Sequence, residues 1–294
     1  MENIKVNFLV QRGQFADDDN AAQMAASVRR LKMNCVEAKY IGFGGGKEEY
    51  KSKKDFSFPE NEPVVFFGTI QMYKYLFRTT KWAPLGWADF DKLKCSYYYD
   101  YFGQFLIDPD YIMLPLREIL RRQDALYDSM AKNHQLFIRP DDNAKSFNGE
   151  VVAQGMLDEW LRGITINAHD ANSVCVVARV KEISDEWRLI VSNGEVISGS
   201  QYRQNGLVEY IKGYENGAKK FAEHVASVVR WQPEIYCMDI AKVNGEYKLV
   251  EIGSVNCAGL YECDIEPIVK RMSELAIKEW RDLTGLESNS TSGT

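Results

Sequence analysis

Several classes of site are excluded by what this chain of 294 residues has little of. It holds only three histidines, and its six cysteines form no CxxC pair, so no spacing typical of a zinc site occurs. No apolar run approaches the ~18 to 20 residues that span a bilayer. A formal net charge of −6 argues against a general nucleic-acid or membrane-surface binder, although it is compatible with a local basic cleft. The scattered cysteines and the absence of an apolar signal region predict free thiols in a reducing cytoplasm.

The composition is that of an ordinary soluble globular protein, with 45% hydrophobic and 27% charged residues. The length suits two domains. Strand and helix patterns alternate in the first part of the chain, which predicts an α/β domain over 1–132. A second domain is expected over 133–286, and a polar tail over 287–294 is expected to be disordered. The elements predicted in order are strands over 4–10, 35–41 and 63–68, helices over 21–33, 69–78, 116–131 and 151–162, and a last helix after Asp264.

A hairpin is indicated near the C-terminal end, where two apolar runs flank the turn pair Asn244-Gly245. One carboxylate interrupts each run, Asp239 in the first and Glu251 in the second. A strict two-residue turn would pair Asp239 with Val250 and mix charge into the apolar face. A longer loop or a bulge would instead pair Asp239 with Glu251. We predict this second register, because it alone gathers the apolar residues on the opposite face, namely Met238, Ile240, Val250 and Ile252.

Opposed carboxylates repel each other by a few tenths to ~1 kcal/mol, so this pairing requires an explanation. One explanation is a shared divalent cation such as Mg²⁺, which takes oxygen ligands and enters a site through one or two carboxylates plus the phosphates of a nucleotide. Asn256 lies just beyond the second strand and could add a carbonyl oxygen. The alternative is that Asp239 and Glu251 are exposed residues on a solvated hairpin face.

A second hairpin is indicated around Asn193-Gly194, with Arg188 on one arm and Arg203 on the other. A two-residue turn would place Arg188 opposite Gly199, so the two arginines need not touch. Arginine binds carboxylate or phosphate through two parallel hydrogen bonds and keeps its charge. Arg188 is therefore either a ligand-binding residue or the partner of a nearby acid, Asp185 or Glu186.

Further motifs lie upstream of the C-terminal hairpin, at Phe137-Ile-Arg-Pro140, Lys145-Ser-Phe-Asn-Gly149 and Glu186-Trp-Arg188 leading into 191–203. Together with Asp239, Glu251 and Asn256, these motifs resemble those of the ATP-grasp fold, and in particular its phage-associated clade named for two arginines and a lysine. The resemblance covers roughly residues 131 to 283. One departure matters: many members carry Glu-x-Asn at the metal-binding end, whereas Gly253 occupies the Asn position here.

The resemblance implies a set of binding residues. Metal ions would be held by Asp239, Glu251 and Asn256. The nucleotide would be bound by Arg139, Lys145, Ala178, Arg179, Val180, Lys181 and Glu182. Within that set Arg139, Lys145 and Lys181 would reach phosphates, backbone groups of 178–180 would bind the adenine base, and Glu182 would bind the ribose. Arg188 and Arg203 would act on the reacting groups. The residues alone leave Lys145 open to a simpler interpretation, as an exposed lysine in a polar loop.

The implied protein is an ATP-grasp enzyme with an N-terminal α/β domain and a C-terminal α+β domain whose two lobes enclose ATP and Mg²⁺. The implied reaction is carboxylate–amine ligation through an acylphosphate, on small-molecule or peptide substrates. A phosphotransferase on the same fold is an alternative, and Gly253 favours a further one, a binding or structural protein with a decayed site. If a phage encodes the chain, the expected location is the host cytoplasm. The oligomeric state stays open.

Overall fold

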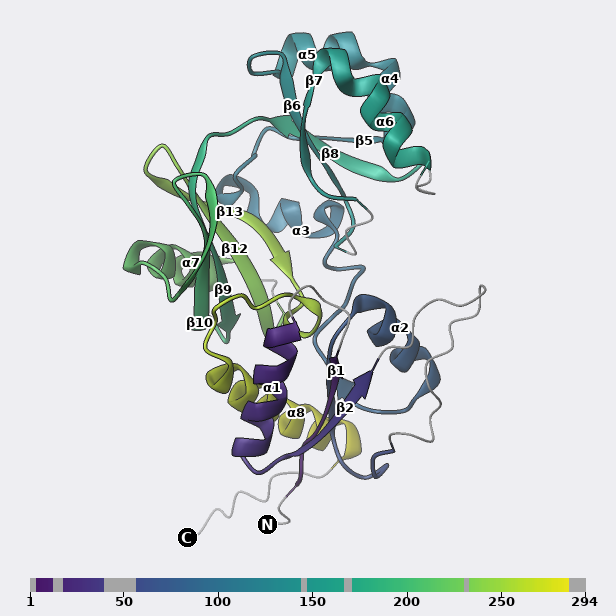
Figure 1. Cartoon of the computed structure of the whole chain (residues 1–294), viewed down its shortest axis with the longest axis vertical. Helices are drawn as coiled ribbons and strands as arrows, with labels where there is room; N and C mark the ends of the chain where they lie inside the picture. The colour runs from purple at the N-terminus through teal and green to yellow at the C-terminus, as the bar shows by residue number, and fades with distance from the viewer. Residues whose placement is uncertain are drawn as a thin grey trace.

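A computed structural model describes residues 4–12, 18–39, 57–143, 147–166, 171–229 and 233–285. Three separate sheets divide this part of the chain into an N-terminal α/β unit, a small lobe and a central five-stranded lobe (Figure 1). The predicted tail over 287–294 lies outside the described residues, as does Lys145. No described helix combines the length and apolar character needed to cross a membrane.

The N-terminal sheet is parallel and has the strand order β2-β1-β3-β4. The strands and helices predicted for this region are confirmed, with ends that shift by a few residues. Strand β3 is buried along its whole length, as expected for an inner strand of a parallel sheet. The elements are β1 (Asn7–Arg12), α1 (Asp18–Arg30), β2 (Asn34–Lys39), β3 (Val64–Phe67), α2 (Ile70–Thr79) and β4 (Pro84–Leu85).

The small lobe is an antiparallel sheet in the order β5-β8-β6-β7, which packs against three helices. Its elements are β5 (Ile112–Pro115), α4 (Leu116–Arg121), α5 (Gln123–Met130), β6 (Gln135–Pro140), β7 (Glu150–Ala153), α6 (Leu157–Ile166) and β8 (Val174–Arg179). The helix predicted over 151–162 is wrong at its start, because 150–153 pair with β6 as a strand. Strand β5 and helices α4 and α5 belong to this lobe, so we propose a domain boundary ahead of β5 rather than at 132.

The central lobe is an antiparallel sheet in the order β11-β10-β9-β12-β13. One face packs against α7 and the aromatic helix α3 through a core that includes Trp187, Leu189 and Met238. Side chains alternate along a strand, so Arg188 and Asp239 project from the other face. The elements are α3 (Cys95–Phe102), β9 (Ile183–Ser192), β10 (Glu195–Gln204), β11 (Leu207–Lys212), α7 (Asn216–Val228), β12 (Ile235–Val243) and β13 (Glu246–Gly253).

The last helix, α8 (Ile265–Thr284), joins the central lobe to the N-terminal unit. It begins directly after Asp264 as predicted, although the Asp264 side chain makes no capping hydrogen bond. Figure 1 shows α8 beside α1. One buried cluster contains Phe8 from β1, Cys237 from β12 and Met272 from α8. The N-terminal unit and the central sheet therefore share a hydrophobic core.

The predicted register of the C-terminal hairpin is confirmed: Asp239 pairs with Glu251. A bulge produces this pairing, since the turn itself has two residues and the register shifts between Asp239 and Ile240. The expectation for Val250 is wrong, because Leu249 takes the place opposite Ile240. In the second hairpin a bulge near position 197 pairs Arg188 with Ser200 rather than with Gly199.

Candidate active site

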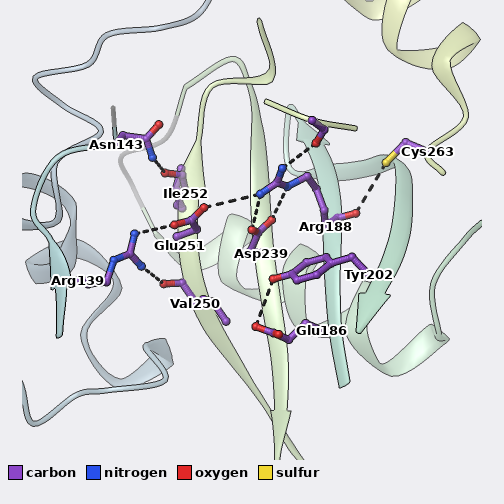
Figure 2. Close-up of polar contacts among 11 residues, drawn as sticks. Arg139, Asn143, Glu186, Arg188, Tyr202, Asp239, Val250, Glu251, Ile252 and Cys263 are labelled. Carbon is purple, nitrogen blue, oxygen red and sulfur yellow. Dashed lines mark hydrogen bonds and ion pairs between the residues drawn. The ribbon is translucent and has the colours of Figure 1, made fainter. Parts of the chain in front are cut away.

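Three charged side chains meet on one face of the central sheet because their strands are neighbours. Strand β12 lies between β9 and β13. Asp239 on β12 pairs with Arg188 on β9 and with Glu251 on β13. Arg188 donates from Nε to Asp239 Oδ1 at 2.8 Å and from Nη2 to Asp239 Oδ2 at 2.7 Å (Figure 2). Its Nη2 also lies 3.7 Å from Glu251 Oε1. The arginine therefore holds Asp239 through two hydrogen bonds and approaches Glu251 as well.

Arg139 reaches the same cluster from the small lobe. It donates from Nη2 to Glu251 Oε2 at 2.6 Å and from Nη1 to the Val250 carbonyl oxygen at 3.2 Å. Val250 is the bulge residue of β13, and it also lines a cavity between the small and central lobes. Arg139 thus bridges the two lobes, as Figure 2 shows.

The cluster is buried and electrically balanced. Arg188 is 6% exposed and Asp239 is 3% exposed. Burial alone would lower the pKa of Arg188, but the charge of Asp239 and the hydrogen bonds to it outweigh that effect and raise the pKa well above its usual value. Two arginines thus face two carboxylates. An uncompensated buried charge would cost several kcal/mol, so the four side chains stabilise one another as a set.

Two cavities adjoin this cluster. The larger, of about 560 Å³, lies between the small and central lobes and has the size of a typical ligand pocket. The smaller, of about 290 Å³, is lined by the start of α2 and by residues 253, 254 and 257–259. Four residues line both cavities: Asn143, Arg188, Asp239 and Glu251.

The predicted nucleotide-binding segment links the small lobe to the central lobe between β8 and β9. Arg179, Val180 and Lys181 line the larger cavity. Ala178 is buried within β8 and pairs with Phe137, so only its backbone could serve a ligand. Glu182 is exposed, pairs with Lys132 at 2.8 Å, and does not line the cavity. The geometry therefore gives no support to Glu182 as the ribose contact.

Arg203 lines the larger cavity but is held by a different acid from the one that holds Arg188. Its Nε lies 2.5 Å from Glu186 Oε2, and Tyr202 Oη donates to Glu186 Oε1 at 3.3 Å. Burial raises the pKa of the Glu186 carboxyl, against the lowering effect of Arg203. Arg188 and Arg203 thus each have their own carboxylate partner, and the alternative of an Arg188 pair with Glu186 is wrong.

Asn256 does not join the two acids, which corrects its prediction as a metal ligand. Its side chain is fully buried; Nδ2 donates to the Phe66 carbonyl oxygen at 2.6 Å and Oδ1 accepts from the Trp87 amide at 2.8 Å. It lines neither cavity. The amide instead ties the segment after β13 to the N-terminal sheet.

Three residues at the site were missed from the sequence. Asn143 follows β6 and contacts β13; its only signal was its place in the polar loop that contains Lys145. Asp108 lines the larger cavity, is 7% exposed and lies 3.5 Å from Lys181, and burial raises its pKa to about 6. Tyr261 stacks with its ring centroid 4.9 Å from Arg188 Cζ. Nothing in a single sequence singles out Asp108 or Tyr261.

The donor set fits a magnesium ion that arrives with phosphate. Among the described residues no group of three or more histidine, cysteine, aspartate or glutamate side chains could hold a metal. Two adjacent carboxylates are nevertheless what Mg²⁺ uses when phosphates and waters complete its shell. Each carboxylate oxygen has two acceptor sites, so a carboxylate that accepts a hydrogen bond from arginine can also bind a cation.

The fold and this charged cleft between two lobes define the chain as an ATP-grasp protein. A sequence comparison then assigns the family. The model that matches residues 117–271 describes an ATP-grasp domain, family 2 of the clade named for two arginines and a lysine. The chain belongs to this family. The predicted superfamily and fold are thereby confirmed. No curated protein matches the sequence.

Solved structures show the same fold at low sequence identity. The D-cycloserine synthetase DcsG has 12% identity and a TM-score of 0.60, over 92% of this chain and 99% of that one. D-alanine–D-alanine ligase from Bacillus anthracis has 10% identity and a TM-score of 0.59, over 95% and 99%. The ATP-grasp ligase PsnB, bound to a minimal precursor, has 14% identity and a TM-score of 0.51, over 92% and 99%. At these identities the neighbours show that the chain shares their fold.

Proposed function

We propose that this protein is a Mg²⁺- and ATP-dependent carboxylate–amine ligase that works through an acylphosphate. The observation that carries the proposal is the junction of the two cavities at Asn143, Arg188, Asp239 and Glu251. A nucleotide in the larger cavity would present its terminal phosphate at this junction, and a carboxylate substrate would enter from the smaller cavity. The reacting atoms would thus meet beside Arg188.

Each residue has a role that follows from its position. Asp239 and Glu251 would hold Mg²⁺, which when bound neutralises phosphate charge and aligns the γ-phosphate. Arg139 bridges the lobes at Glu251 and would contact phosphate oxygens. Arg188 is permanently charged and buried, so it would stabilise the negative charge that develops during phosphoryl transfer.

The reaction would proceed in two transfers. A carboxylate oxygen of the first substrate attacks the γ-phosphorus, the bond from that phosphorus to the bridging oxygen breaks, and ADP leaves. The nitrogen of a neutral amine then attacks the acyl carbon, the carbon–oxygen bond breaks, and inorganic phosphate leaves. The amine proton is released to solvent. The chain's own contribution is positioning and charge stabilisation, so no covalent nucleophile is required.

The structural neighbours support this choice over other chemistry on the fold. A structure of the Bacillus anthracis ligase contains ATP, and one of PsnB contains a precursor, Mg and ADP. On that basis we propose ATP and Mg²⁺ for this chain, and an acid and an amine that are small molecules or part of a peptide.

A hydroxylamine assay tests the proposal. The protein is incubated with ATP, Mg²⁺ and a panel of amino acids and short peptides, with hydroxylamine as a generic amine that converts an acylphosphate to a hydroxamate. A ligase yields hydroxamate and inorganic phosphate in equal amounts with ADP. A phosphotransferase would yield ADP with a stable phosphorylated product and no free phosphate, and a decayed site would yield neither. Either of those results would refute the ligase.

A further inference from the structure

Asn143 crosses from the small lobe to the strand that carries Glu251. It lies just after β6, and its Nδ2 donates to the Ile252 carbonyl oxygen at 3.0 Å. Figure 2 shows its side chain directed at β13, on the same side as Arg139. It lines both cavities, together with the two acids and Arg188. Among these four residues it is the only neutral one, and no role has been given to it so far.

Gly253 leaves open the space that the Asn143 side chain occupies. A Cβ atom built on Gly253 would lie 3.7 Å from Asn143 Nδ2 and 3.8 Å from Oδ1, with no other atom within 4 Å. Gly253 is not among the described glycines with positive φ, so its backbone does not require glycine. A longer side chain at this position would collide with Asn143. The two positions are therefore complementary: one has no side chain, and the other supplies a carboxamide to the same space.

The hydrogen bond to Ile252 fixes which end of the carboxamide remains available. The Ile252 carbonyl can only accept, so the NH₂ group must face it. The amide oxygen faces away from that carbonyl (Figure 2) and accepts no hydrogen bond from any described residue. An oxygen acceptor attracts a cation and repels phosphate. This orientation points to a metal ion rather than to a phosphate as the partner of Asn143.

We propose that Asn143 Oδ1 is a protein ligand, supplied across the cleft, for the Mg²⁺ that Asp239 and Glu251 bind together with ATP. The inference rests on the proposed function, because it assumes a metal nucleotide in the larger cavity. It also gives the small lobe a direct part in metal binding, since Asn143 follows β6 whereas both acids lie on the central sheet. Binding of the metal would then hold the loop after β6 against β13.

The test measures Mn²⁺ binding by electron paramagnetic resonance, in the presence of the non-hydrolysable nucleotide AMP-PNP. The variants are Asn143→Ala, Gly253→Asn and the double variant that carries both changes. Gly253→Ala is the matched control, because its Cβ meets Asn143 only at ordinary contact distance. Thermal unfolding of each variant reports on folding independently of the metal.

Loss of the ligand in Asn143→Ala is expected to weaken Mn²⁺ binding about tenfold or more, while Gly253→Ala binds as the parent does. The double variant is expected to recover most of that loss, because an amide at 253 can occupy the space vacated at position 143. Recovery would not be expected if Asn143 only fastened the loop to Ile252. Unchanged Mn²⁺ binding in Asn143→Ala, with or without a lower melting temperature, would overturn the inference.

A second variant keeps the test decisive if Asn143→Ala folds poorly. Asn143→Asp retains an oxygen but cannot donate to Ile252, so a ligand role predicts Mn²⁺ binding within about threefold of the parent. A tenfold loss of Mn²⁺ binding in Asn143→Asp would assign Asn143 to loop attachment and overturn the proposal. If the parent protein itself bound no Mn²⁺ with AMP-PNP, the proposed function would fail, and this inference with it.

Discussion

Single residues at the site show how buried charge is tolerated when it is paired. Arg188 and Asp239 are joined by two hydrogen bonds, whose fork geometry lysine cannot reproduce. Arg203 also faces the larger cavity, but its side chain is 39% exposed and its partner is Glu186. The sequence predicted both arginines as catalytic. We expect activity to depend more on the side-chain geometry of Arg188 than on that of Arg203.

Replacement of each arginine by lysine tests this difference between Arg188 and Arg203. We expect Arg188→Lys to lower kcat about 10²- to 10³-fold, because lysine provides one donor group where the transition state needs a fixed fork. Arg203→Lys should lower kcat less than tenfold. The measurement is steady-state ADP release for both variants. Equal losses in the two variants would remove the distinction drawn here between the arginines.

Asp108 should make stability depend on pH in an unusual direction. Its folded pKa of about 6 exceeds the unfolded value of roughly 3.9, so the native state binds more protons between these values. The free energy of unfolding contributed by this group therefore falls as pH rises from about 4 to about 6, by about 2–3 kcal/mol. Asp108→Asn should abolish that fall, as chemical denaturation at several pH values would reveal.

A neighbouring acid provides the control for that experiment. Asp110 is exposed, so Asp110→Asn should retain the parent's pH dependence. If Asp108→Asn and the parent protein lost the same stability between pH 4 and pH 6, Asp108 would not be the buried acid that causes it.

At the residue scale, the pairing of Asp239 with Glu251 was predictable because a local pattern carried the information. Asp239 and Glu251 were identifiable because each interrupts an apolar run beside a recognisable turn. Asn256 follows the same motif, yet it packs into the N-terminal sheet, and contacts with Phe66 and Trp87 cannot be read from local spacing. Asn143 was missed for the same reason, since its contact with Ile252 depends on how the lobes meet.

At the scale of elements, bulges decide which side chains reach the cleft. The bulge at Val250 brings Glu251 opposite Asp239 and turns the Val250 carbonyl toward Arg139. The sequence predicted this outcome because only one register separated charge from apolar residues. It did not predict the bulge in β10, where apolar and polar residues do not alternate strongly enough to choose between registers. Arg188 lies on β9, and the pairing of β9 with β12 places it opposite Asp239.

Close packing of β10 predicts a sensitive glycine. A Cβ on Gly199 would lie 2.5 Å from Tyr214 Cδ1 and 2.6 Å from Leu189 Cδ2, both too close for real contacts. Gly199→Ala should therefore destabilise the protein by about 1–3 kcal/mol. Gly155→Ala is the control, because nothing lies within 4 Å of its added Cβ. Urea denaturation compares the two, and equal stability would show that β10 can move away from its neighbours.

The whole molecule is held together by a core that contains residues from both sides of the predicted domain boundary at residue 132. Met272 on α8 is fully buried in the cluster that also contains Phe8 and Cys237. Sequence patterns identified the elements at both ends of the chain. Such patterns indicate which face of a helix or strand is buried, but not which distant element packs against that face. The return of α8 to the N-terminal unit is information that only the tertiary structure contains.

A core mutation should therefore affect both ends of the chain together. Met272→Ala is expected to cost about 2–5 kcal/mol, and to lower the unfolding transition of the N-terminal and central sheets equally. Leu283→Ala, at a side chain that is 67% exposed, should be nearly neutral. Hydrogen exchange followed by mass spectrometry would resolve the two sheets. Loss of protection confined to α8 would contradict a shared core.

The most direct test of the account is calorimetric titration of ATP with and without Mg²⁺, on the parent protein and on Glu251→Gln. Binding by the parent protein should depend on Mg²⁺, and Glu251→Gln should weaken it at least about tenfold, because one of the two metal-facing charges is lost. Glu182→Gln, outside the cavity, should bind as the parent does. Equal Mg²⁺-dependent affinity in the parent and in Glu251→Gln would contradict the claim that Asp239 and Glu251 bind the metal nucleotide.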